Sequence, residues 1–252
     1  MSLDRGDIQR LWINAKDSII HALDHFSMLA HGKGNHWHEK WIILSVHHAA
    51  DYFLRMLLKD VDPNDSQRYF SDPSKVYLGK TRYVLLKYKD SGKLKSWELK
   101  LLDLVGSLNQ QRIDIAHRDP SDHLDPTTAA WSILAILRAA SRRFDIAPEE
   151  IFDQYPPIQR EVVEAIHWRH LDEYSAFIEA VLAEEHPETR FFELCPYCGT
   201  HAIYGSRCEG CFEEVSSESC ASCGADFYVP SDRQAFPDED YNCPECGAKP
   251  SE

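Results

Sequence analysis

The eight cysteines of this chain constrain its fold more than any other feature. They lie in four pairs that share the spacing Cys-x-x-Cys: Cys195/Cys198, Cys208/Cys211, Cys220/Cys223 and Cys243/Cys246. A tight turn with this spacing lets both thiolates face one ion, and Zn²⁺ prefers four such sulfur ligands in a tetrahedron. In a reducing compartment the pattern indicates metal ligands rather than disulfides. The sequence therefore predicts two structural Zn²⁺ ions.

The assignment of the four pairs to the two ions is open at the level of sequence. The simplest arrangement joins sequence-adjacent pairs, so that the first two pairs bind one ion and the last two bind the other. Spacing alone also permits two other pairings, one of them crossed. A site closed by four thiolates has no position for water, so we expect both ions to be structural rather than catalytic.

Residues 191–252 are similar to tandem zinc ribbons, and they are strongly acidic. They hold three basic residues against twelve acidic ones. Each tetrathiolate site adds about two further negative charges. Such a surface repels phosphate, so we expect the ribbons to have a structural role or to dock a protein partner.

Residues 1–190 are predicted to form an all-α helical bundle, joined to the ribbons at about residues 187–193. The chain is 43% hydrophobic and 27% charged, which is ordinary for a globular protein with a real core. Apolar residues at helical spacing predict helices at about 7–30, from Ile42 to near Asp60, from Leu94 to beyond Ile115, from Asp125 onward and at 158–185. Residues 61–93 are expected to be a long connection or a weaker helix.

The location of the protein is predicted from two negative features. No apolar run approaches the ~20 residues that a membrane span needs. The first residues lack the charged and then apolar pattern of a signal peptide. We therefore expect a cytoplasmic protein.

A second pattern lies at the end of the helix that begins near Leu94. The apolar stripe of this helix places Arg112 where an aliphatic side chain is expected, and His117 follows five residues later. A buried, unpaired guanidinium is costly, so we expect Arg112 to face a partner or a polar cavity. An arginine and a histidine at this spacing, at a helix end in a helical bundle, resemble the HEPN family (higher eukaryotes and prokaryotes nucleotide-binding domain). Asp51, on an earlier helix, stands in place of the family's usual glutamate.

The resemblance implies a metal-independent endoribonuclease, in a toxin or defence system, that acts as a homodimer. It implies that His117 transfers a proton and that Arg112 holds the scissile phosphate, with Asp51 or Asp114 orienting one of them. Attack by the adjacent 2′-hydroxyl leaves a 2′,3′-cyclic phosphate and a 5′-hydroxyl. The chain departs from the family at Ile113, where asparagine, aspartate or histidine is usual.

The geometry of a regular helix separates the two candidate catalytic residues. Residues five apart differ by about 140° around the axis, so Arg112 and His117 do not share one face. They can converge through a distorted last turn or across a two-fold axis. The dimer that the resemblance implies provides such an axis.

A basic stretch provides candidate RNA-binding residues. Residues 75–100 carry eight basic residues against two acidic ones, with tyrosines interleaved at 77, 83 and 88. Cations bind phosphates, and tyrosine rings stack on bases. The predicted RNA-binding residues are Lys80, Arg82, Lys87, Lys89, Lys93 and Lys95. The alternative interpretation is a solvated loop.

Simpler interpretations also apply to the candidate catalytic residues. Asp51 and Arg55 are four residues apart, as are Asp114 and Arg118, so each pair can form an ion pair on a helix surface. His117 can cap a helix C-terminus. The alternative function is that of a non-catalytic HEPN-like dimerisation or interaction protein, whose acidic ribbons dock a protein partner. Phosphate loops and dinucleotide fingerprints are absent from the sequence.

Seven of the thirteen histidines lie between residues 21 and 48. His21 and His25 have the spacing of a metal-binding pair on a helix. The segment that follows His38 lacks the second histidine of the zinc-protease signature. The sequence identifies no third ligand, so hydrolysis at a histidine metal site is the less favoured enzymatic interpretation.

Overall fold

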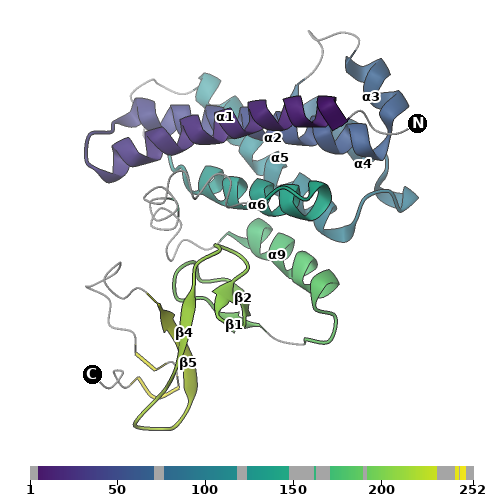
Figure 1. Cartoon of the computed structure of the whole chain (residues 1–252). Helices are drawn as coiled ribbons and strands as arrows, with labels where there is room; N and C mark the ends of the chain where they lie inside the picture. Colours follow the sequence, from purple (N-terminus) through teal and green to yellow (C-terminus); the bar gives the residue numbers. More distant parts are fainter. Residues whose placement is uncertain are drawn as a thin grey trace.

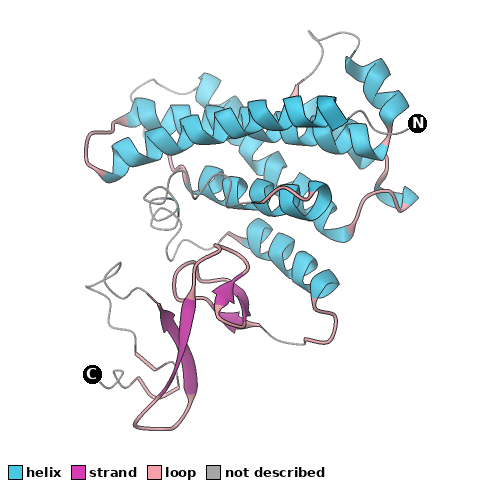
Figure 2. Ribbon diagram, viewed as in Figure 1, coloured by secondary structure: helices cyan, strands magenta, loops and turns pink. Residues whose placement is uncertain are grey.

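The computed structural model describes residues 5–70, 77–117, 124–147, 162, 171–189, 192–231, 242–243 and 245–247. Within these residues the N-terminal part is helical and the C-terminal part contains short strands (Figures 1 and 2). The predicted helical bundle is therefore observed, followed by two small β units. None of the described helices is both long and apolar enough to cross a membrane.

The first two helices form a long antiparallel hairpin. Helix α1 spans Arg5–Ala30 and helix α2 spans His36–Val61. The side chain of Asn35 caps α2 by accepting a hydrogen bond from the amide of Trp37 at 3.0 Å. Helix α2 ends at Val61, directly before Asp62 and Pro63, because proline cannot donate the next helical hydrogen bond.

The other helices complete the bundle. They are α3 (Pro63–Phe70), α4 (Leu78–Leu86), α5 (Ser96–His117), α6 (Thr127–Phe144) and α9 (Asp172–Glu185), with a short 3-10 helix at Lys89–Ser91. Residues 61–93 were expected to be a connection or a weaker helix. Their described part contains the short helices α3 and α4 and the 3-10 helix. The N-terminal part of the helix predicted at 158–185 lies mostly outside the described residues.

Aromatic side chains from several helices meet in the core. The largest fully buried side chains include Phe53, Trp97, Trp131, Tyr174 and Phe177. The ring centroids of Trp131 on α6 and Tyr174 on α9 are 4.2 Å apart. Burying one such ring stabilises the fold by about 2–3 kcal/mol, so these contacts dominate the packing of α6 against α9.

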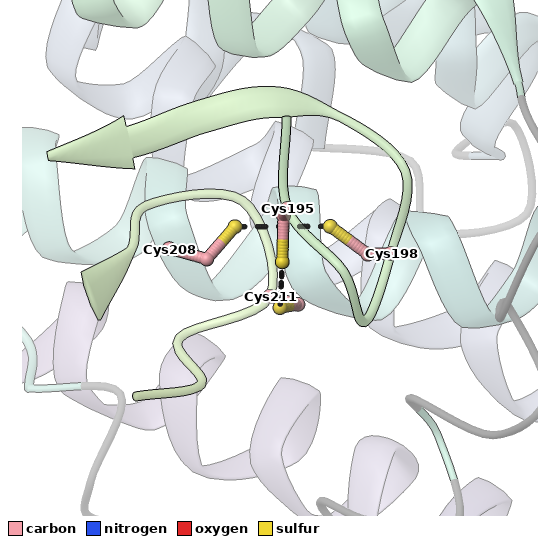
Figure 3. Close-up of side chains that lie close together, drawn as sticks. All are labelled: Cys195, Cys198, Cys208 and Cys211. Carbon is pink, nitrogen blue, oxygen red and sulfur yellow. Dashed lines mark hydrogen bonds between the residues drawn. The ribbon is translucent and has the colours of Figure 1, made fainter. Parts of the chain in front are cut away.

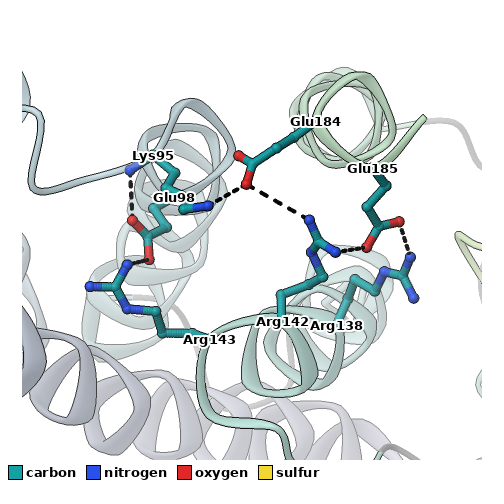
Figure 4. A network of polar contacts seen from close by, with 7 residues as sticks. All are labelled: Lys95, Glu98, Arg138, Arg142, Arg143, Glu184 and Glu185. Atoms are coloured by element: carbon teal, nitrogen blue, oxygen red, sulfur yellow. Dashed lines mark hydrogen bonds and ion pairs between the residues drawn. The ribbon is translucent and has the colours of Figure 1, made fainter. Parts of the chain in front are cut away.

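A network of ion pairs ties together the ends of three helices (Figure 4). Glu98 is fully buried; it accepts a hydrogen bond from the amide of Lys95 at 2.7 Å and pairs with Arg143 at 3.2 Å. Burial raises the pKa of Glu98, and these donors oppose that shift. On α6 and α9, Arg142 pairs with Glu185 at 2.6 Å. These contacts join the start of α5 to the ends of α6 and α9.

Two small antiparallel sheets form the C-terminal part. The first contains β1 (Glu193–Leu194), β2 (His201–Tyr204) and β3 (Arg207–Cys208), in the order β1-β2-β3. The second pairs β4 (Val215–Ser219) with β5 (Asp226–Pro230). Each sheet accompanies one group of cysteines, in agreement with the arrangement expected from the sequence.

The first sheet packs against the helical bundle, whereas the second sheet is divided: Val215 and Tyr228 pack with the main core, and Phe227 and Val229 belong to a separate small core. Side chains of residues 195–215 belong to the same hydrophobic cluster as the helices. Arg138 on α6 pairs with Glu209 at 2.7 Å. The second cluster consists of Cys220, Phe227, Val229 and Cys243 with Ala225 packed against it. The boundary predicted between domains 1–190 and 191–252 falls at residues outside the described ranges and stays a prediction.

Candidate functional site

The cysteines form two groups that can each hold a metal ion. One group contains Cys195, Cys198, Cys208 and Cys211, and the other contains Cys220, Cys223, Cys243 and Cys246. Figure 3 shows the four side chains of the first group converging from two turns. Sequence-adjacent pairing, the simplest of the three possibilities, is therefore the arrangement that the structure adopts.

The sulfur atoms have the separations of a tetrahedral site. In the first group, Cys195 and Cys211 have Sγ atoms 3.8 Å apart, and those of Cys198 and Cys208 are 3.7 Å apart. In the second group, two such distances are 3.5 and 3.7 Å. Four sulfurs at about 2.3 Å from a central ion are about 3.8 Å from one another. Both groups therefore fit a tetrahedral ion with thiolate ligands.

One backbone turn is repeated at all four cysteine pairs. The amide of the residue after the second cysteine donates to the carbonyl of the first cysteine at 2.8–2.9 Å. That residue has a positive φ of 65–74° in every case: Gly199, Phe212, Gly224 and Gly247. Glycine adopts this conformation without strain, whereas a side chain there costs about 1–2 kcal/mol.

Phe212 is the departure from the glycine pattern, and the sequence analysis assigned it no role. Its ring is buried, and the guanidinium of Arg207 lies 5.4 Å from the ring centroid. The Nε atom of Arg207 also donates to the carbonyl oxygen of Phe212 at 3.2 Å. These contacts offset the strain of the left-handed backbone. The sequence does mark Phe212 as unusual, because the residue after the second cysteine is glycine in the other three pairs.

Polar groups surround the sulfurs of the first group. The amide of Tyr197 lies 3.4 Å from Sγ of Cys195, and the amide of Gly210 lies 3.3 Å from Sγ of Cys208. The buried hydroxyl of Thr200 is 3.0 Å from Sγ of Cys198. Donors around a sulfur stabilise its thiolate form, so this surrounding favours metal binding.

The two groups differ in exposure. All four cysteines of the first group are buried, whereas Cys223 and Cys246 of the second group are exposed. The first group also lies beneath α9, where the hydroxyl of Tyr174 donates to the carbonyl oxygen of Gly210. Burial raises the pKa of Tyr174, so its hydroxyl keeps its proton and remains a donor.

Arg112 does not occupy a buried position. The apolar stripe of α5 is buried through Leu108, but Arg112 and His117 are both exposed to solvent. The expectation that Arg112 interrupts a buried stripe is therefore wrong, because this face of α5 emerges from the bundle after Leu108. No carboxylate of the described residues forms an ion pair with Arg112. Within this chain, a regular helix directs Arg112 and His117 to different sides.

A histidine that the sequence analysis did not single out lies near Arg112. Nε2 of His47, on α2, is 3.2 Å from the side-chain oxygen of Asn109, one turn before Arg112 on α5. Burial is the main cause that lowers the pKa of His47 to about 4; the hydrogen bond to Asn109 opposes this shift, and the positive charges of His48 and Arg112 contribute to it. His47 is therefore neutral at pH 7 and ties α2 to the part of α5 that carries Arg112.

The two candidate carboxylates make local contacts. Asp51 forms an ion pair with Arg55, as the simpler interpretation expected. Burial raises the pKa of Asp51, and Arg55 opposes that shift. Asp114 accepts a hydrogen bond from Gln110 at 3.0 Å, and Arg118 lies outside the described residues. Among the residues that the structure describes, neither carboxylate forms a hydrogen bond with Arg112 or His117.

The predicted RNA-binding residues divide into two sets. Arg82 donates to the carbonyl oxygen of Leu102 at 2.5 Å, Lys93 pairs with Asp62 at 3.3 Å, and Lys95 pairs with Glu184. These three side chains have structural contacts. Lys87 and Lys89 are exposed, which leaves their ammonium groups in reach of a ligand, whereas Lys80 is half-buried.

Two exposed tyrosines lie on α4 or directly before it. Tyr77 and Tyr83 are 60% and 63% exposed, and the ammonium group of Lys87 lies 5.2 Å from the centroid of the Tyr83 ring. A Cβ at Gly79 would lie 3.5 Å from the Tyr77 ring and 3.6 Å from the Asn109 side chain. The start of α4 therefore lies beside the residue one turn before Arg112.

Comparisons with models of protein families, with curated protein sequences and with solved structures found no match to this chain.

Proposed function

We propose that this chain is a metal-independent endoribonuclease of HEPN type, active as a homodimer, with two Zn²⁺-stabilised ribbons. The proposal combines the resemblance carried by Arg112 and His117 with the surroundings of these residues. The observation that carries it is the exposed guanidinium of Arg112, which has no carboxylate partner among the described residues. Arg55, Arg82, Arg138, Arg142 and Arg143 all pair with carboxylates.

An exposed and unpaired guanidinium suits phosphate binding. Its planar array of donors matches two phosphate oxygens, and no local carboxylate competes for it. Arg112 is therefore the side chain that we assign to the scissile phosphate and to the charge that develops on it.

A second copy of the chain completes the proposed site. Arg112 and His117 project from different sides of α5, so one copy supplies the arginine of a site and the other supplies its histidine. Between them lies Ile113, a large apolar side chain that is 37% exposed. Contact between two copies along this end of α5 would remove Ile113 from water and bring the two charged residues together.

The proposed reaction requires proton transfer but no metal. The 2′-hydroxyl loses its proton and attacks the adjacent phosphorus, and the 5′-oxygen leaves as it gains a proton. We assign one of these transfers to His117, because an imidazole has one nitrogen that can accept a proton and one that can donate a proton. Arg112 stabilises the phosphorane-like transition state. The products are a 2′,3′-cyclic phosphate and a 5′-hydroxyl.

The RNA approaches along α4 in this proposal. Tyr77 and Tyr83 offer stacking surfaces for unpaired bases, and Lys87 offers a cation for the backbone. The start of α4 lies beside Asn109, one turn before Arg112. A single strand that stacks on these tyrosines is thereby directed toward the guanidinium.

We assign Zn²⁺ to both cysteine groups. Four thiolates at tetrahedral separations are the preferred ligands of this ion, and a closed set of four leaves it no catalytic position. The ribbons have few apolar residues, so the ion provides much of their folding free energy. The role of Zn²⁺ in the proposal is to hold the ribbons together, and no step of RNA cleavage involves it.

The competing function is that of a non-catalytic interaction protein. It is favoured by the acidic character of the second ribbon, which is the segment that carries β4, β5 and the second cysteine group. Glu214, Asp226 and two exposed cysteines lie at its surface. Such a surface would bind a basic protein partner. RNA cleavage distinguishes the two functions.

The test measures cleavage of labelled single-stranded RNA in the presence of EDTA, with end-group analysis of the products. We expect activity that the substitutions Arg112→Ala and His117→Ala each reduce by at least about a hundredfold, while the control substitutions Arg10→Ala and His31→Asn do not. Cleavage that persists in both site variants, or no cleavage by the unmodified protein, contradicts the proposal.

Mixed dimers test whether two copies share the site. An Arg112→Ala chain and a His117→Ala chain that exchange freely form dimers in which one site has both residues. Activity should then return to about a quarter of the unmodified value, because half of the dimers carry one intact site out of two. A site within one chain predicts no recovery.

A further inference from the structure

Three histidine side chains meet near the turn of the α1–α2 hairpin. His21 and His25 are one turn apart on α1, with ring centroids 4.7 Å apart. His38, from the first turn of α2, has its ring centroid 4.9 Å from that of His25. The Nδ1 atoms of His25 and His38 are 2.8 Å apart. The fold thus provides the third imidazole that the sequence did not identify.

We propose that His21, His25 and His38 form a third metal site, which binds a divalent transition metal ion. Imidazole nitrogens bind Ni²⁺, Cu²⁺ and Zn²⁺, and no sulfur is part of this cluster. The site is independent of the proposed ribonuclease activity and separate from both cysteine groups.

The spacing of His25 and His38 indicates the class of ion. The two Nδ1 atoms share a hydrogen bond at 2.8 Å, and a metal ion that replaces its proton needs the nitrogens to move slightly apart. Two nitrogens bound at about 2.1 Å lie about 3.0 Å apart when the angle at the metal is 90°, and about 3.4 Å apart in a tetrahedron. The right angle needs the smaller movement and is typical of Ni²⁺ and Cu²⁺, so these are the proposed ions.

A hydrogen bond prepares His21 for coordination. Its Nδ1 atom lies 2.8 Å from the hydroxyl oxygen of Ser45, a buried residue of α2. When Nδ1 donates to this oxygen, Nε2 carries the free electron pair that a metal requires. Hydrogen-bonded partners of this kind orient histidine ligands in many metal sites.

An exposed tryptophan packs against the cluster. Trp41 is 48% exposed, and its ring stacks on that of His25 at an interplanar angle of 12°. The edge of His21 lies against the same ring, with centroids 6.0 Å apart. The stacked indole thereby restricts the ring of His25, which lowers the entropic cost of binding an ion at that ring.

The site requires a small adjustment of one ring. Among the described residues, the two cysteine groups are the sets whose ligand atoms already lie within 4.8 Å of one another. Because His25 and His38 are in contact, His21 is the ring that shifts toward the pair. Its exposed position on α1 permits this movement.

The experiment uses the full chain without a histidine tag, loaded with Zn²⁺ and freed of excess metal. Ni²⁺ is titrated into it by isothermal calorimetry at pH 7.5, and Zn²⁺ and Ni²⁺ are then counted by mass spectrometry after gel filtration. We expect one Ni²⁺ to be bound per chain with no loss of Zn²⁺. The variants His25→Asn and His38→Asn should each weaken Ni²⁺ binding by at least about tenfold.

His31→Asn is the matched control, because His31 lies in the same hairpin but bonds to the carbonyl of Ser27. It should change Ni²⁺ affinity less than twofold. A second measurement needs no variant: Ni²⁺ should broaden the imidazole NMR signals of His21, His25 and His38 before those of the other histidines. Ni²⁺ uptake matched by Zn²⁺ release, no uptake, or equal affinity in all variants overturns the proposal.

Discussion

The side-chain hydroxyl of Tyr174 on α9 donates a hydrogen bond to the carbonyl oxygen of Gly210, which lies between two cysteines of the first metal group. Both residues are at the junction of the helical bundle and the first ribbon, which is the segment that carries β1, β2, β3 and the first cysteine group. This bond and the Arg138–Glu209 ion pair connect the folding of the two parts. In the second ribbon, by contrast, Cys220, Phe227, Val229 and Cys243 form a separate small core.

The substitution Tyr174→Phe should destabilise the whole protein. It keeps the ring but leaves the buried carbonyl of Gly210 without its donor, which costs about 1–3 kcal/mol. Urea denaturation of the zinc-loaded protein measures the loss. Tyr77→Phe is the control, because the exposed hydroxyl of Tyr77 can bond to water; it should change the free energy of unfolding by less than about 0.5 kcal/mol. Equal effects of the two substitutions would contradict this role for Tyr174.

Once both cysteine groups are loaded with Zn²⁺, the two groups should release it at different rates. The second group has two exposed cysteines and a small core, so a chelator reaches its ion after a local opening. We expect two phases of zinc release, separated by at least about tenfold in rate, with helical circular dichroism retained through the first phase. A dye that absorbs on binding Zn²⁺ follows the release.

Single cysteine variants should show the same asymmetry. Cys246→Ser should leave one tightly bound ion and a folded bundle, whereas Cys198→Ser should also lower the stability of the helical part. Simultaneous loss of both ions, or equal effects of the two variants on helical stability, would show that the ribbons unfold as one unit.

Stability should decrease as the pH falls from about 6.5 toward 4, and His47 should account for part of the decrease. Its pKa is about 4 in the folded protein and near ~6.5 when unfolded, so below pH 6.5 the unfolded state binds the additional proton. Neutral His47 contributes its full stabilisation above about pH 6.5. The free energy of unfolding then falls by roughly 2–3 kcal/mol as the pH decreases through this window.

The variant His47→Gln isolates this effect from acid-induced zinc loss. Glutamine can still donate to Asn109 but does not titrate. Urea denaturation at several pH values, with the same zinc content in both proteins, should give a weaker pH dependence for the variant. Identical slopes would exclude His47 as the titrating group.

The surface of α4 should determine RNA affinity. Tyr83→Ala removes a stacking surface and should weaken binding of single-stranded RNA by about 1–3 kcal/mol. Lys87→Ala should lower the dependence of log affinity on log salt by about one unit. Lys93→Ala is the matched control in the same basic stretch, because Lys93 already pairs with Asp62. Fluorescence anisotropy at several salt concentrations tests all three, and an effect of Lys93 equal to that of Lys87 would contradict this assignment.

The metal-binding cysteines and most helices follow from local patterns. Four Cys-x-x-Cys pairs specify tight turns, and the helical spacing of apolar residues specifies which face is buried, so both are readable over a few residues. The position of Phe212 illustrates the limit of such patterns. Glycine occupies the left-handed position of the other three turns, but at Phe212 packing of the ring against Arg207 offsets the strain.

The candidate ribonuclease site was less predictable. The extension of the apolar stripe from Leu108 to Arg112 placed the arginine in the core, whereas α5 leaves the bundle before that turn. The proximity of His47 to Asn109 spans 62 residues of sequence, and no local pattern reports such a contact. The functions of Arg112 and His117 remain predictions for the cleavage experiments.

Short-range information in the chain was sufficient for the helical bundle, the cysteine turns and the acidic character of the ribbons, because each depends on residues a few positions apart. Three-dimensional packing was needed to select one of three cysteine pairings, to bury one metal group and expose half of the other, and to bring His38 to His25. These outcomes depend on contacts between helices and strands that are far apart in the sequence. No pattern over a few neighbouring residues reports the free energy of such contacts.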